Sequence, residues 1–134
     1  MQPGRELDEL VAEKVLGWNV FMGTEIPESI TMRDVPEDRR HLKRVWVRGG
    51  VRMACEECGD MPAFSEDISA AFRVVEEIRG CGFNVTIGFS WVFEAWVCEC
   101  SNIFTKKYYT KIEFSQPMAI CLAALKAVGV EVPA

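Results

Sequence analysis

Apolar residues recur every three or four positions in three segments of the chain, which is the spacing of one face of an α-helix. The first segment begins at Pro3 and ends at Gly17, residues typical of the start and the end of a helix. The second follows Ser65, its predicted N-cap residue. The third, residues 117–128, is apolar nearly all round. We therefore predict three helices, of which the last is the most buried.

Alternating apolar and polar residues predict strands ahead of the second helix. Short strands are expected at residues 18–22 and 41–48. The pair Gly49-Gly50 is typical of a two-residue hairpin turn, which would lead into a strand at residues 51–54. Residues 24–40, which hold two prolines and mixed charges, are predicted to form a loop or an insertion.

A second group of strands is predicted between the second and third helices. Residues 83–89 alternate and indicate a half-buried strand that turns near residues 88–90, and residues 91–100 indicate the next strand. Residues 102–114 fit either a strand or a loop. Most of the large aromatic residues are predicted to pack in the core or on a sheet face, with one or two left to line a pocket. They are Trp18, Trp46, Trp91, Trp96, Phe83, Phe89 and Phe93.

The composition is that of an ordinary folded protein. The chain has 134 residues, 49% of them apolar and 26% charged, which favours one domain over residues 1–134. Its net charge of −5 argues against general nucleic-acid binding. No apolar run approaches the ~20 residues that cross a bilayer. Acidic residues also stand where a signal peptide would be apolar, so we predict a cytoplasmic location with no membrane partner and six reduced cysteines.

The three helical segments resemble the phage ABA-sandwich domain family. The sequences of residues 3–18, 64–78 and 116–128 are similar to those of the family's opening, second and closing helices, in the same order. The resemblance implies an α+β fold built as an α/β/α three-layer sandwich, with a mostly antiparallel sheet and three main helices. It also implies a phage or prophage protein in the cytoplasm of an infected or lysogenic bacterium. It supplies no catalytic residues, and the 24–40 segment and the Cys55-x-x-Cys58 pair depart from the family's pattern.

Four cysteines have a spacing that could form a zinc site. Cys55-x-x-Cys58, followed by a glycine, is typical of half of a zinc knuckle, and Cys98-x-Cys100 places two more thiols on one strand face. We therefore consider Cys55, Cys58, Cys98 and Cys100 as zinc ligands, against the alternative of core and loop thiols. A thiol-dependent enzyme is a weaker hypothesis, because the single histidine, His41, has no spacing that links it to a cysteine.

Basic residues gather around one tryptophan. Arg44, Arg48 and Arg52 surround Trp46 in the sequence and could form a patch for an anion or a protein partner, since guanidinium groups suit phosphate and carboxylate. The alternative is that these arginines form a solvent-facing strand surface. Altogether the sequence predicts a non-catalytic binding or interaction module that acts on a host protein, a phage protein or a small metabolite, and that could form a homo-oligomer. The alternative is a zinc-stabilised structural protein.

Overall fold

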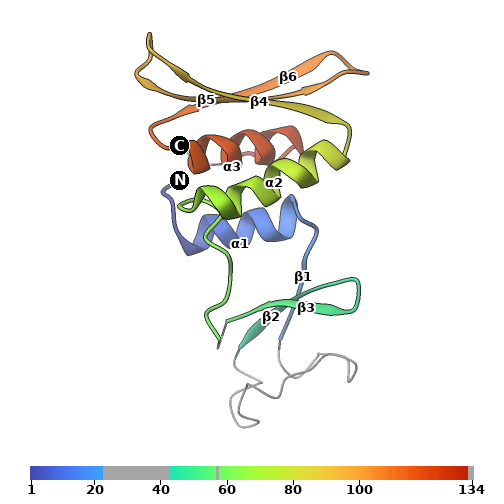
Figure 1. The fold of residues 1–134 in the computed structure, drawn as a ribbon. Helices are drawn as coiled ribbons and strands as arrows, with labels where there is room; N and C mark the ends of the chain where they lie inside the picture. Colours follow the sequence, from blue (N-terminus) through green and yellow to red (C-terminus); the bar gives the residue numbers. More distant parts are fainter. Residues whose placement is uncertain (23–42, 57, 133–134) are drawn as a thin grey trace. The chain divides into compact units, whose positions relative to one another are not determined.

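The computed structural model describes residues 1–22, 43–56 and 58–132 (Figure 1). The chain divides into two compact units, a larger one of residues 1–16 with 63–134 and a smaller one of residues 17–62. The described elements are three helices and two three-stranded antiparallel sheets, which confirms the predicted α+β sandwich class. The predicted loop at residues 24–40 and the single histidine lie outside the described residues. The prediction of one domain stays a prediction.

The larger unit contains all three helices and one sheet (Figure 1). Its elements are α1 (Arg5–Lys14), α2 (Ile68–Gly80), β4 (Phe83–Ser90), β5 (Ala95–Asn102), β6 (Lys107–Glu113) and α3 (Gln116–Ala127). The sheet has the order β4-β5-β6, with each strand antiparallel to its neighbour. Helix α3 contacts β5 and β6, and α2 contacts β4, so that both helices lie against the same face of the sheet (Figure 1).

Helix α3 forms the centre of the larger unit. Its N-cap Ser115 accepts a hydrogen bond from the Met118 amide at 3.3 Å, and Pro117 occupies the first turn. Every residue from Pro117 to Leu125 is buried. The prediction that the last helix is the most buried is confirmed, because no charged side chain interrupts its surface before Lys126.

Helix α2 begins later than its sequence pattern predicts. The prediction that Ser65 caps it is wrong: the helix starts at Ile68, and Asp67 is the N-cap, accepting a hydrogen bond from the Ser69 amide at 3.0 Å. Serine and aspartate are both common N-cap residues. Asp67 caps the helix here, because the Ser65 hydroxyl is hydrogen-bonded elsewhere. Ser65 is only 1% exposed and bonds to the first helix.

A buried cluster of hydrogen bonds joins the N-terminal residues, residues 64–65 and α3. The Ser65 amide and hydroxyl both donate to Asp8 Oδ1, at 2.8 and 2.7 Å, and the hydroxyl oxygen accepts from the Gly4 amide at 2.9 Å. The Cys121 thiol donates to the Phe64 carbonyl at 3.1 Å. Burial raises the pKa of the Asp8 carboxyl, and the bonds from Ser65 oppose that rise. We call these residues (Gly4, Asp8, Phe64, Ser65 and Cys121) the core polar cluster.

The smaller unit is a three-stranded antiparallel sheet of β1 (Asn19–Met22), β2 (Arg44–Arg48) and β3 (Val51–Cys55), in that order. The hairpin predicted from Gly49-Gly50 is confirmed. Both glycines have positive φ, 59° and 75°, as a tight turn of the primed type requires. Val45, Val47 and Cys55 form a small apolar cluster with Phe21 packed against it.

Candidate functional site

The hairpin between β4 and β5 presents large apolar side chains to solvent. Its turn is Trp91 to Glu94, and Trp91 is 85% exposed, Val92 88% and Phe93 61%. The prediction that Trp91 and Phe93 pack in the core or on a sheet face is therefore wrong. The turn also lies beyond residues 88–90, where the sequence places it. The same prediction is confirmed for Trp18 and Trp46, which are 3% and 0% exposed.

The turn has a defined geometry. Ser90 pairs with Ala95, so the two strands stay in register up to the last residue before the turn. The Ser90 hydroxyl oxygen accepts a hydrogen bond from the Phe93 amide at 3.3 Å, a local bond that Ser commonly makes in turns. Glu94 takes a left-handed conformation, with φ 51°, and closes the loop. The exposed side chains are thus carried by an ordered backbone.

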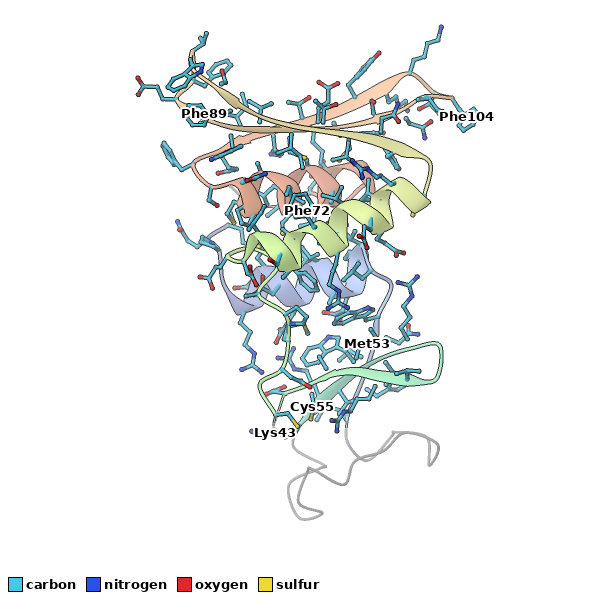
Figure 2. The ribbon with its side chains drawn as sticks, viewed as in Figure 1. Lys43, Met53, Cys55, Phe72, Phe89 and Phe104 are labelled. Atoms are coloured by element: carbon cyan, nitrogen blue, oxygen red, sulfur yellow. The ribbon has the colours of Figure 1, made fainter. Side chains whose placement is uncertain are left out.

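Aromatic rings continue from the turn onto the strands. Phe89 makes edge-to-face contacts with Trp91, at 5.1 Å between ring centroids, and with Trp96 on β5, at 5.6 Å. These are favourable geometries for aromatic pairs. Phe89 lies at the end of the hairpin that extends away from the helices (Figure 2). We call Phe89, Trp91, Val92 and Phe93 the aromatic tip.

The hairpin between β5 and β6 has the same design with different chemistry. Its turn runs over residues 103–106, and Asn102 Oδ1 accepts from the Phe104 and Thr105 amides at 2.9 and 3.2 Å. Lys106 takes the left-handed conformation, with φ 57°. Phe104 is 84% exposed and lies at the opposite end of the sheet from Phe89 (Figure 2). Glu94 closes one turn and Lys106 the other, so the two ends of the sheet differ in charge.

The aromatic tip could not be predicted from the sequence, because the apolar–polar alternation of strand β4 continues through the turn. Phe89, Trp91 and Phe93 keep the period of two, and no Gly, Pro, Asn or Asp stands between residues 89 and 95. The one available signal is Ser90, whose hydroxyl can start a turn. Strand β6, for which the sequence fits either a strand or a loop, carries lysines beside Tyr109 on its helix-bearing face and so gives no clean alternation of apolar and polar residues.

The cysteines of the predicted zinc site divide between the two units. Cys98 and Cys100 lie on β5, 0% and 1% exposed, whereas Cys55 is buried and Cys58 exposed in the smaller unit. The Cys55 amide donates to Asp60 Oδ1. In the part of the chain that the structure describes, no three His, Cys, Asp or Glu side chains are grouped to hold a metal ion. A zinc site at Cys55, Cys58, Cys98 and Cys100 stays a prediction.

Two of the buried thiols, Cys98 and Cys121, have the chemistry of core residues. A hydrogen bond with Cys100, together with burial, raises the pKa of Cys98 far above the ordinary value of a thiol. Burial likewise raises the pKa of Cys121, and the nearby Asp8 adds to that rise. Because the thiolate is the nucleophile, Cys98 and Cys121 lack the property that a catalytic cysteine needs.

Thiol labelling should separate the cysteines by exposure. In the native protein we expect iodoacetamide to modify Cys58 and Cys81, which are exposed, and to spare the buried Cys55, Cys98, Cys100 and Cys121. Peptide mass spectrometry after brief labelling measures this directly. A zinc chelator is the matched arm: if Cys58 reacts only after chelation, metal protects it and the zinc hypothesis gains support. Rapid native labelling of Cys98 would contradict the buried-thiol description.

The predicted basic patch is already engaged within its own unit. Arg44 Nε lies 2.7 Å from Glu56 Oε2, and its guanidinium carbon stands 5.2 Å from the centroid of the Trp46 ring. Trp46 is fully buried, and its indole N–H has no acceptor among the described residues. Arg48 is exposed and Arg52 half-buried. A binding role for Arg44, Trp46, Arg48 and Arg52 therefore stays a prediction.

A pocket of about 410 Å³ lies beside the C-terminal end of α3. Lys111 of β6, Leu122 and Lys126 of α3, and Glu131 contribute to its lining. Its charges are mixed, since two lysines and one glutamate contribute to it. The lining does not select one class of small ligand.

Comparison with known proteins identifies a family and finds a solved structure of similar fold. The family model described as the phage ABA sandwich domain matches residues 9–125. A crystal structure of a phage protein from Bacillus cereus ATCC 14579 superposes with a TM-score of 0.61 and 18% identity, covering 99% of this chain and 97% of that one. This likeness concerns the fold. The comparison with curated proteins gives no match. Among the helices of the described residues, none has the length and apolar character needed to cross a bilayer.

Proposed function

The chain belongs to the phage ABA sandwich domain family, and we propose that it is a non-catalytic interaction module whose aromatic tip docks another protein. The observation that carries this proposal is the exposure of Trp91, Val92 and Phe93 on a well-ordered turn. Large apolar side chains gathered on a surface mark binding sites, because water contact with them is unfavourable.

The order of the turn supports a role in binding. The contacts of Phe89 with Trp91 and Trp96 and the Ser90 bond hold the rings before any partner arrives. A surface ordered in advance loses less conformational entropy on association, which leaves more of the burial energy for affinity. Tryptophan is also enriched among the residues that dominate binding energy at interfaces.

The tip also indicates the chemistry of its partner. Three apolar side chains on a protruding turn fit a concave apolar pocket, and Glu94 beside them favours a basic group on the pocket's rim. The acidic turn and the net charge of −5 are unfavourable for an anionic bilayer surface. We therefore infer a phage or host protein as the partner, in the cytoplasm of the bacterium that carries the phage. The six cysteines are thiols and form no disulfide, which agrees with a reducing compartment.

Substitution at the aromatic tip tests the proposal. The full chain is used to capture proteins from the phage-bearing bacterium, and the captured protein is then purified and its affinity measured by calorimetry. We expect Trp91→Ala combined with Phe93→Ala to weaken binding by about 30-fold or more, the size of a binding hot spot of ~2 kcal/mol. Phe104→Ala, which removes an equally exposed ring at the other end of the sheet, is the matched control and should leave the affinity unchanged.

Two results would contradict the proposal. One is a purified partner that binds the Trp91→Ala, Phe93→Ala variant as tightly as the parent chain. The other is retention of the parent chain, but not of this variant, by phosphatidylcholine–phosphatidylglycerol vesicles, which would make the aromatic tip a membrane anchor.

A further inference from the structure

Strand β6 is the last strand of its sheet, and within the described residues it pairs with β5 alone. The ladder between them runs over all seven residues of β6, from Lys107 to Glu113, without a shift of register. Every second residue of an edge strand points its N–H and C=O groups away from the sheet, ready to pair with another strand. Natural edges of this length are commonly interrupted by a bulge or a proline, and β6 has neither.

The side chains of β6 divide between two faces. Tyr109 and Lys111 stand opposite Cys100 and Cys98 and therefore share the face that bears the helices. The even-numbered residues of β6 lie on the other face, where Tyr108 is 66% and Ile112 42% exposed. Phe114, just after the strand, is 92% exposed. The edge thus combines unpaired main-chain groups with exposed apolar side chains.

We propose that β6 pairs antiparallel with β6 of a second copy of the chain, centred on Thr110, to form a continuous six-stranded sheet. In this register Lys107 stands opposite Glu113 of the second copy, and Tyr108 opposite Ile112. Thr110 meets its own equivalent. Opposite charges, an aromatic with a β-branched residue, and a pair of threonines are all favourable cross-strand pairs. By symmetry each unlike pair occurs twice.

The charges of β6 select this register. Centring the pair one residue earlier, on Tyr109, would place Lys107 opposite Lys111 of the second copy. Centring it one residue later would place Lys111 opposite its own equivalent. Both arrangements set like charges against each other, which is unfavourable. Centring the pair between two neighbouring residues would set odd-numbered residues of one copy opposite even-numbered residues of the other. The helix-bearing faces of the two copies would then lie on opposite sides of the sheet. Strand β4, the other edge, has no charged residue that could set a register.

This inference goes beyond the proposed function, because β6 contains no residue of the aromatic tip. Its failure would leave the docking role of Trp91 and Phe93 intact, and failure of that role would leave the dimer intact.

Charge exchange across the edge tests the dimer. Sedimentation equilibrium of the purified full chain should show a monomer–dimer equilibrium. Lys107→Glu and Glu113→Lys should each raise its dissociation constant about tenfold, since each puts like charges together twice per dimer. The double exchange, Lys107→Glu with Glu113→Lys, should restore it. Lys14→Glu, an exposed reversal on α1, is the matched control and should change nothing.

A cross-link reads the register directly. In a chain carrying Cys58→Ser and Cys81→Ser, the substitution Thr110→Cys should give a disulfide-linked dimer on mild copper–phenanthroline oxidation, because residue 110 faces itself. Tyr108→Cys should not, because it faces Ile112 of the second copy. A chain that stays monomeric at all concentrations overturns the proposal. The proposal is also overturned if the dissociation constant of the dimer does not change on charge exchange and the cysteines at residues 110 and 108 cross-link equally well.

Discussion

Replacing Ser65 with alanine is expected to lower the free energy of unfolding by about 2–4 kcal/mol, although it removes a single oxygen atom. That oxygen donates to Asp8 Oδ1 at 2.7 Å and accepts from the Gly4 amide at 2.9 Å. Without it, a carboxyl that is only 4% exposed loses one of its two donors from Ser65. Burying a polar group without its partner costs far more than the net value of the bond. Chemical denaturation measures the loss.

The control and the pH dependence make this prediction specific. Ser69→Ala is the same change at an exposed position of α2, and should alter stability by at most ~0.5 kcal/mol. Burial holds the pKa of Asp8 above 3.8, and the Ser65 bonds stabilise its charged form. The cost of Ser65→Ala should therefore be greatest above that raised pKa and should shrink as the pH falls below it, where Asp8 is protonated. Equal costs for Ser65→Ala and Ser69→Ala would contradict the role of the core polar cluster.

The core polar cluster explains why three separate segments carry the family resemblance. Gly4 and Asp8 belong to the first segment, Phe64 and Ser65 to the second, and Cys121 to the third. These segments are distant in sequence, yet their hydrogen bonds meet in one buried place. The resemblance therefore lies in residues that fold the larger unit, and it carries no information on what the chain binds.

Much of the fold could be predicted because local chemistry and burial agree. Helix α3 is apolar along nearly its whole length, begins at a Ser-x-Pro start and ends before a glycine, so each signal indicates the same element. The pair Gly49-Gly50 needs a turn in which both residues have positive φ, and the structure has that turn. Ser65 was assigned wrongly because a good cap residue is also a good buried hydrogen-bond partner. Only the position of Asp8, far away in sequence, decides between the two.

The candidate site could not be predicted, because solvent exposure leaves no trace in a pattern that normally indicates burial. Trp91 and Phe93 continue the alternation of β4, and in isolation they suit the core of a sheet. What places them outside is that the helices stop short of the hairpin end, a fact of tertiary packing (Figure 2). Strand β6 could not be predicted firmly either, because its sequence pattern is weaker than its structure. It is an edge strand with lysines on its helix-bearing face, so its alternation is weak although its pairing with β5 is regular.

Substituting alanine for Phe64 is expected to cost about 3–5 kcal/mol, and the same substitution at Phe104 almost nothing. Phe64 is 0% exposed, and its ring has the Arg73 guanidinium carbon 5.8 Å from its centroid. Its removal would leave a cavity next to the carbonyl that accepts the Cys121 bond, so the melting temperature should fall by roughly 10–20 °C. Phe104 is 84% exposed and makes no comparable packing.

Thermal unfolding of the two variants, followed by circular dichroism, gives the comparison directly. A large loss at Phe64 with none at Phe104 would show that an exposed ring at a hairpin end of this sheet does not contribute to folding. A matching loss at Phe104 would mean that its ring is held in packed contacts and would contradict its exposure. Because both changes remove the same ring, hydrophobicity alone cannot produce a difference between them. The difference measures burial, which separates the residues that fold this chain from those available to a partner.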